Sequence, residues 1–199
     1  MKLILTRHGE TIENQKKIMQ GHMPGHLSKQ GIEQAKKLAM RLKDEKIDAI
    51  YSSELKRAVD TAKEIAKYYK KISIDFVQEL RETNLGSLTG KCSRDMDWNN
   101  RPEDIESAAS MQKRAKKLLD RVYGKYPNKT VLFIGHNGIN KALINVILNK
   151  SADQIEEIGN QFNTSVSIFE IKENKNHIVH LMNSIKHLEY FLYFSAKTI

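Results

Sequence analysis

The stretch that decides the fold is KLILTRHGET, residues 2–11. A short apolar run that ends at Arg, His and Gly predicts a buried strand stopping at a sharp turn. Ligands of open α/β sheets collect at the carboxyl ends of the strands, so Arg7 and His8 lie where a site is expected. Taken alone, the two residues could equally be a solvated cation and a satisfied turn histidine.

Strand and helix patterns alternate along the rest of the chain, which predicts a single α/β domain. Ser28 is the expected N-cap of the first long helix, and Pro127 ends another. The segment 12–27 has little periodicity and is expected to be a loop. Predicted strands cover residues 47–51, 72–77 and 130–134, with a terminal pair at 165–171 and 177–182; predicted helices cover 28–42, 53–69, 111–126 and 139–148.

Composition narrows the classes of function. The chain has 199 residues, of which 40% are hydrophobic, enough for one well-filled domain. A net charge of +9 favours anionic partners, but the lysines are scattered and no basic stripe interleaved with aromatics argues for nucleic acid. Cys92 is the only cysteine, which excludes an internal disulfide and fits a reducing cytoplasm. We expect no signal peptide, because Met1-Lys2 leads directly into the predicted strand, and no apolar run approaches the roughly 20 residues of a membrane span.

A second histidine repeats the arrangement of the first. His136 follows the apolar run 130–134, so the ends of two parallel strands would place His8 and His136 at one edge of the sheet. Two such histidines are harder to explain by packing than one. Zinc ranks below an anion because no third ligand follows in a local pattern. Arg7 and Arg57 also lie at strand ends, where guanidinium groups suit phosphate.

Four motifs in this order resemble the histidine phosphatase superfamily, in its phosphoglycerate mutase-like branch. The match spans roughly residues 2–188, and Asn137 stands where a Gly is frequent in the family. The resemblance implies a three-layer α/β/α sandwich whose central sheet is mostly parallel with an antiparallel edge strand. It also implies a histidine phosphatase domain at 1–188, with 189–199 as a C-terminal tail. The motifs are LTRHGET (5–11) with Asn14, YSSELKRA (51–58) with Thr61, Glu82 with Gly86 and Gly90, and GHNG (135–138).

The resemblance implies a phosphohistidine mechanism without metal or cofactor, in which His8 is the nucleophile and Glu82 the proton donor. A neutral imidazole can attack phosphorus in line while cations neutralise the phosphoryl oxygens. The like charge of a phosphate favours a protonated Glu82, which could donate to the leaving alkoxide and then activate water. The implied phosphate ligands are Arg7, His8, Asn14, Arg57 and His136, with the backbone N–H of Asn137 as a further candidate.

Several of these assignments have rivals in the sequence. Glu79 competes with Glu82 for the acid role, and Glu82 could instead be a surface carboxylate paired with Arg81. Asn14 could cap a turn, and we interpret Glu10 as structural. The histidines that match no motif are expected at the surface or in strands: His22, His26, His177, His180 and His187.

The short segment 91–110 leaves little room for a substrate-covering insertion, so water can reach the intermediate. This favours a phosphatase of small phosphomonoesters, such as sugar phosphates or phosphoglycerates, over a phosphoglycerate mutase. An inactive phospholigand-binding or scaffolding member is a further alternative, which the intact set of charged residues argues against. Lys91, Arg94 and Arg101 could contact an acidic substrate or be ordinary loop charges. The apolar run 190–194 is expected to pack on the domain or at a homodimer contact.

Overall fold

The computed structural model describes residues 1–97 and 100–189. Its centre is a six-stranded sheet in the order β3-β2-β4-β1-β5-β6, so β1 and β4 are neighbours at the middle. All the residues between the ends of these two strands are buried, as their apolar runs predict. The strands are β1 (Lys2–Arg7), β2 (Ala49–Ser52), β3 (Ile74–Phe76), β4 (Thr130–Gly135), β5 (Val166–Glu170) and β6 (Ile178–Ser184).

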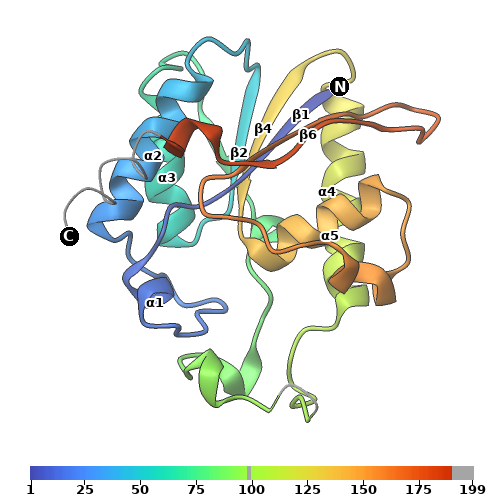
Figure 1. Cartoon of the computed structure of the whole chain (residues 1–199). Helices are drawn as coiled ribbons and strands as arrows, with labels where there is room; N and C mark the ends of the chain where they lie inside the picture. Colours follow the sequence, from blue (N-terminus) through green and yellow to red (C-terminus); the bar gives the residue numbers. More distant parts are fainter. Residues whose placement is uncertain (98–99, 190–199) are drawn as a thin grey trace.

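Helices cover both faces of the sheet, which makes the predicted three-layer sandwich (Figure 1). The pair α2 (Lys29–Leu42) and α3 (Lys56–Ala66) packs on one face, and α4 (Ala108–Lys125) with α5 (Asn137–Ile147) packs on the other. Short elements fill the connections: α1 (Ile12–Gln15) and the 3-10 turns η1 (Gln78–Leu80), η2 (Gly86–Leu88), η3 (Ser93–Asp95), η4 (Ala152–Glu157) and η5 (Lys186–Leu188).

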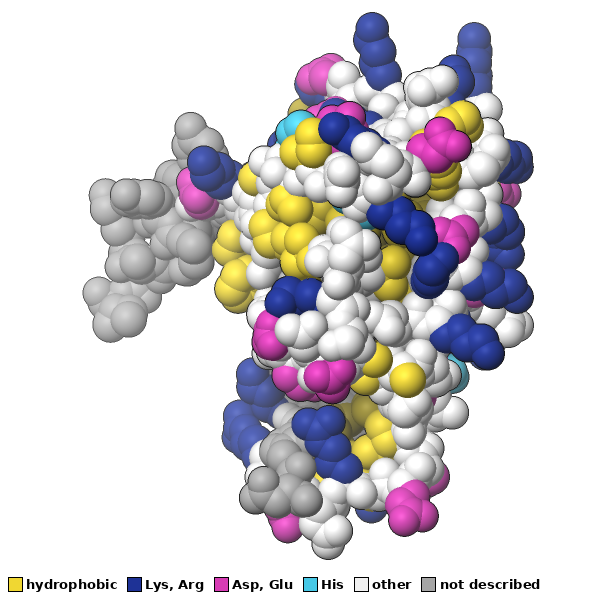
Figure 2. Space-filling view, turned by 90° about the vertical axis from the view of Figure 1, so that its right-hand side faces the viewer, with side chains coloured by type: hydrophobic (Ala, Val, Ile, Leu, Met, Phe, Trp, Pro, Cys, Tyr) yellow, Lys and Arg dark blue, Asp and Glu magenta, His cyan; other side chains and the backbone are white. Residues whose placement is uncertain are grey.

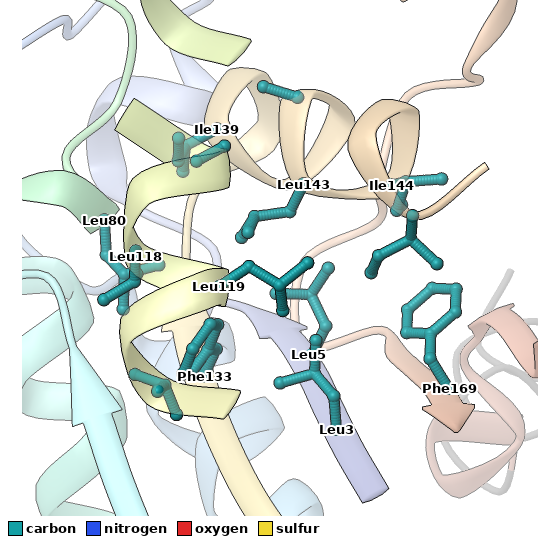
Figure 3. Packing of buried hydrophobic residues seen from close by; sticks show 14 of the residues in the cluster. Leu3, Leu5, Leu80, Leu118, Leu119, Phe133, Ile139, Leu143, Ile144 and Phe169 are labelled. Carbon is teal, nitrogen blue, oxygen red and sulfur yellow. The ribbon is translucent and has the colours of Figure 1, made fainter. Parts of the chain in front are cut away.

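Each face of the sheet has its own hydrophobic core. Figure 3 shows Leu118 and Leu119 of α4, with Leu143 of α5, packed against Leu5 of β1 and Phe133 of β4. All five side chains are almost fully removed from water. Burying a leucine or phenylalanine contributes about 1.5–3 kcal/mol, so these contacts fix the position of β1 and β4 relative to α5.

The sheet is mostly parallel, as expected. β1 pairs with β4, and β2 pairs with β3 and β4, all in parallel register. The antiparallel strand is β5, which pairs with β1 on one side and β6 on the other. The edge strand β6 therefore runs antiparallel to its neighbour β5, which confirms the predicted antiparallel edge strand. The hairpin expected from the two terminal strands is present, and β6 forms the edge.

Local signals explain the ends of the helices that lead to the site. Ser28 accepts a hydrogen bond from the backbone N–H of Gly31, which makes it the N-cap of α2 as predicted. The segment 12–27 contains one helical turn, α1, where a loop was expected. Thr11 and Asn14 form a reciprocal capping box that starts this turn.

On the face that Figure 2 shows, the charged side chains do not form a single stripe. Figure 2 shows Lys and Arg side chains spread from the top of the molecule to its lower part, with Asp and Glu between them. No helix among residues 1–97 and 100–189 has the length and apolar character to cross a membrane. The predicted domain boundary after residue 188 stays a prediction, and the apolar run 190–194 lies outside the described residues.

Candidate active site

The carboxyl ends of β1 and β4 bring the two motif histidines together. Arg7 is in register with Gly135, and the backbone N–H of His8 donates to the Gly135 carbonyl over 3.1 Å. The imidazole centroids of His8 and His136 are 5.0 Å apart. Both residues are buried, at 2% and 0% exposure. The predicted meeting of the two histidines at one sheet edge is therefore what the structure has.

Hydrogen bonds select one tautomer of His8. Its Nδ1–H donates to the carbonyl of Gly9 over 2.7 Å, which leaves a lone pair on Nε2. That Nε2 accepts from Nε of Arg57 over 3.2 Å. Burial, and then the charges of Arg57 and Arg7, hold the pKa of His8 well below its usual value. His8 is therefore a neutral imidazole with an unprotonated nitrogen at neutral pH.

Arg57, in the first turn of α3, joins the site to the loop that follows α1. Its Nε donates to His8 and also to Nδ1 of His136 over 3.1 Å. Its Nη2 donates to the carbonyl of Gly21 over 2.9 Å, and its Nη1 donates to the carbonyls of Met23 and Pro24. Burial lowers the pKa of Arg57 to about 10, so the side chain keeps its charge at neutral pH.

Two buried N–H groups beside these contacts have no acceptor among the described residues. One is Nε of Arg7, whose Nη1 donates to the carbonyl of Gln161 over 2.6 Å. The other is Nε2 of His136, which carries the proton because Nδ1 accepts from Arg57. Buried donors are nearly always hydrogen-bonded in proteins, so this pair suits an anionic group with several acceptor oxygens.

A cavity of about 810 Å³ opens at this edge of the sheet. Six of the seven predicted site residues line it, and His136 is buried behind them against His8 and Arg57. Apolar side chains complete part of the wall, including Ile18, Met19 and Leu85. The lining residues predicted from the sequence are Arg7, His8, Asn14, Arg57, Glu82 and Asn137.

Glu82 reaches the cavity from the segment between η1 and η2. Its Oε1 accepts from the backbone N–H of Gly138, at the start of α5, over 2.8 Å, and from that of Thr83 over 2.9 Å. Burial lowers the pKa of Arg7, and the Glu82 charge opposes that shift. Glu79, the rival carboxylate, pairs with Arg121 over 2.8 Å and does not line the cavity.

Arg114 of α4 holds the segment that carries Glu82. Its guanidinium donates to the backbone carbonyls of Glu79, Arg81 and Glu82 over 2.8–3.1 Å. The same group forms an ion pair with Glu106, another residue of the cavity wall. His22, which the sequence placed at the surface, is half-buried and contacts the Glu82 carbonyl through Nε2 over 2.9 Å.

The two asparagines differ in what they leave for a ligand. The Oδ1 of Asn14 accepts from the Thr11 N–H in the capping box, so its amide nitrogen is the remaining donor. The side chain of Asn137 bonds to Asn160 and to the N–H of Gln161. Only its backbone N–H, at the N-terminus of α5, remains for an anion.

Sequence reasoning missed the residues after β4 and α5 that support the turn around His8. The Nδ2 of Asn163 donates to the His8 carbonyl over 3.0 Å, and the backbone N–H of Thr164 donates to the Arg7 carbonyl over 3.0 Å. The N–H of Gly9 donates to Oγ1 of Thr61. No short-range motif marks Asn163 or Thr164, because their partners lie about 155 positions away in the chain.

Two glycines make the close approach of α2 to this turn possible. A Cβ atom on Gly9 would lie 2.5 Å from the carbonyl oxygen of Gly31. A Cβ on Gly31 would lie 1.9 Å from the carbonyl oxygen of Glu10. Real Cβ atoms do not approach backbone this closely, so both positions require glycine.

The fold and the site define an α/β protein with a cationic, histidine-centred cavity at the carboxyl ends of its strands. The chain belongs to the histidine phosphatase superfamily, branch 1, whose family model matches residues 3–184. The expected family is thereby confirmed.

Curated relatives and a solved structure resemble nearly the whole chain. It is 32% identical to phosphoserine phosphatase 1 of Hydrogenobacter thermophilus, with all of both chains covered. It is 31% identical to phosphoglycerate mutase-like protein 4 of Arabidopsis thaliana, over 94% of this chain and 87% of the relative. A variant of phosphoserine phosphatase from Entamoeba histolytica, solved in complex with phosphoserine, has a TM-score of 0.83 and 27% identity over 94% of this chain and 98% of that chain.

Proposed function

We propose that this protein is a phosphatase that hydrolyses small phosphorylated metabolites through a phosphohistidine at Nε2 of His8. The observation that carries the proposal is the unprotonated Nε2 of a buried, neutral imidazole beside two arginines. A neutral imidazole is a nucleophile, and the guanidinium groups of Arg7 and Arg57 offset the charge of the phosphoryl oxygens.

In the first step, the lone pair of His8 Nε2 forms a bond to phosphorus as the ester P–O bond breaks. The leaving alkoxide takes a proton from the carboxyl group of Glu82, which lines the same cavity. Before the reaction, the Nε–H of Arg57 donates to both imidazoles. Once His8 Nε2 is bonded to phosphorus, this N–H donates to Nδ1 of His136 alone. The unpartnered N–H groups of Arg7 and His136 and the N–H of Asn137 donate to the phosphoryl oxygens.

In the second step, water attacks the phosphorus of the phosphohistidine. The Glu82 carboxylate takes a proton from this water, the P–N bond breaks and its electron pair returns to His8 Nε2. The products are inorganic phosphate and the starting enzyme. The hydrogen bonds from Gly138 and Thr83 to Glu82 Oε1 leave Oε2 for these proton transfers.

Hydrolysis is favoured over transfer to a second hydroxyl. Of the described residues between η2 and α4, four line the wall (Ser93, Arg101, Ile105 and Glu106), and a cavity of about 810 Å³ has room for water beside a small substrate. Relatives with phosphatase names support the same reaction, and phosphoserine is bound in a similar fold. Phosphomonoesters of small hydroxy acids and amino acids are therefore the proposed substrates.

The test is a panel of such esters, followed for both free phosphate and isomerised product, with wild-type protein and His8→Ala. We expect phosphate release that a chelator does not change and that His8→Ala abolishes. Rapid quenching should trap phosphate on His8 in an acid-labile, base-stable form. Isomerised product with little phosphate release would overturn hydrolysis in favour of the mutase, and full turnover by His8→Ala would overturn the mechanism.

We also propose a cytoplasmic location, in keeping with the single cysteine, and a homodimer. Fractionation of the producing cells and the mass of the purified protein by light scattering test these two statements. A protein recovered outside the cytoplasm, or a monomer at micromolar concentration, would overturn them.

A further inference from the structure

An ion pair between a buried lysine and an exposed glutamate lies in the cavity wall, beyond the groups that the reaction uses. Lys141 lies on α5, one turn after Asn137, and is only 7% exposed. Its Nζ is 2.6 Å from Oε2 of Glu156 on η4. Both residues line the cavity. Neither has a part in phosphoryl transfer as described above.

The two side chains of this pair differ in their exposure to water. The Lys141 side chain is 9% exposed, whereas that of Glu156 is 66% exposed. A cation with so little access to water is costly to bury, and one carboxylate uses only one of its three N–H donors. The hydrogen bond from Lys141 holds the pKa of Glu156 below its usual value, helped by the charge of Arg101. At neutral pH this part of the wall therefore presents a positive and a negative group side by side.

The distance from the phosphate end fits a small substrate. Asn137 and Lys141 are four residues apart on one helix, which places them about 6 Å apart along its axis and on the same face. A few covalent bonds separate the phosphorus of a phosphoamino acid from its α-carbon. The α-carbon carries a carboxylate and an ammonium group, the two charges that this wall complements.

We propose that Lys141 and Glu156 form the subsite for the zwitterionic end of a phosphoamino acid, with Lys141 binding its carboxylate and Glu156 its ammonium group. The inference rests on the proposed function, since it assigns the other end of the same substrate. The competing explanation is a purely structural ion pair, a structural pin that only holds η4 against α5.

Four substrates separate the two charges. Phospho-L-serine carries both groups, 3-phosphoglycerate only the carboxylate, phosphoethanolamine only the ammonium, and glycerol 3-phosphate neither. We expect kcat/KM to be highest for phospho-L-serine and lowest for glycerol 3-phosphate. Each correctly paired charge contributes about tenfold or more, as charge-assisted hydrogen bonds do.

Two variants assign each charge to its residue. In Lys141→Met, kcat/KM for the two carboxylate substrates should fall about tenfold more than for phosphoethanolamine. In Glu156→Gln, phospho-L-serine should lose its advantage over 3-phosphoglycerate. Glu156 is mostly exposed, so this second variant folds even if burial makes Lys141→Met unstable. The neighbouring pair Lys150 and Glu157, 2.5 Å apart and outside this cavity, gives matched controls as Lys150→Met and Glu157→Gln.

The outcomes are distinguishable. Unchanged substrate ratios in both variants, with a lowered unfolding temperature, would overturn the subsite and leave the structural pin. Equal losses for all four substrates would also overturn it. If the wild-type protein released phosphate from none of the four esters, the proposed function itself would fail, and the subsite with it.

Discussion

The Nε atom of Arg57 lies 3.2 Å from Nε2 of His8, and the same N–H lies 3.1 Å from Nδ1 of His136. One guanidinium on α3 therefore bridges the ends of β1 and β4. Its other nitrogens bond to carbonyls of the loop that closes one side of the cavity. A planar fork with five N–H donors can make all of these contacts at once, and an ammonium group cannot.

Replacing Arg57 with lysine should therefore abolish most of the activity although it keeps the charge. We expect kcat/KM to fall about 10²–10³-fold, as for the loss of a fixed donor at a reacting oxyanion. Steady-state kinetics, with the affinity for inorganic phosphate, measure this change. Arg41→Lys is the control, because Arg41 is partly exposed on α2, where it pairs with Glu45 over 3.1 Å. Wild-type kinetics in Arg57→Lys would contradict the bridging role.

Glu82→Gln should lower kcat about 10²–10⁴-fold, because the amide cannot supply a proton to the leaving alkoxide. The defect should shrink for p-nitrophenyl phosphate in the burst of the first turnover, since nitrophenolate leaves without a proton. Glu79→Gln is the matched control, since Glu79 pairs with Arg121 away from the cavity. An equal loss in both variants would argue against Glu82 as the proton donor.

Gly138→Ala should impair activity although it replaces no charged residue. Its Cβ would lie 2.5 Å from Oε1 of Glu82 and 2.3 Å from Oγ1 of Thr83, so the carboxylate must move. Gly124→Ala in α4 is the control, because its Cβ would meet nothing within 4 Å. That second change should raise the free energy of unfolding by about 0.5–1 kcal/mol and leave kcat/KM unaltered. Denaturant titration and kinetics of both variants measure the contrast.

The free energy of unfolding should decrease as the pH is lowered below the range in which an ordinary histidine titrates. Burial and the Arg57 charge hold the pKa of both His8 and His136 well below the usual value. The unfolded chain, whose histidines titrate near about 6.5, therefore binds more protons than the native protein below that pH. Stability is fully present above about 6.5, and each histidine removes about 1.4 kcal/mol per pH unit as the pH falls toward its native-state pKa.

His8→Gln should make the free energy of unfolding less dependent on pH. Between roughly pH 6 and 5 its slope against pH should fall by about 1.4 kcal/mol per pH unit, which corresponds to about one proton. Urea unfolding at several pH values measures it. The control is His180→Gln on the exposed edge strand β6. An identical slope in wild-type protein and His8→Gln would mean that His8 is protonated in the native state.

The sequence predicted the middle of the sheet and the tips of its strands because those features depend on local patterns. An unbroken apolar run followed by a glycine and a histidine marks a strand end wherever its neighbours lie. Thus β1, β4, His8 and His136 could be placed from their own residues. The same holds for Ser28, whose capping role depends on a residue three positions away.

The features that the sequence could not predict depend on contacts between residues far apart in the chain. Alternation shows that a strand is half-buried but does not name its neighbour, so the position of β5 next to β1 required the structure. The shape of the segment around Glu82 depends on Arg114, some 30 residues away. The partnership of Lys141 with Glu156 is likewise invisible in either residue alone.

The paired glycines at positions 9 and 31 set a limit on how this enzyme can be diversified. The backbone of α2 and the backbone of the turn that follows His8 touch directly there, without side chains between them to absorb a change. A mutagenesis library that varied either glycine would mostly yield inactive clones, whichever substrate was screened. Libraries intended to change substrate preference should instead keep both glycines fixed and randomise the opposite wall around Arg101 and η4.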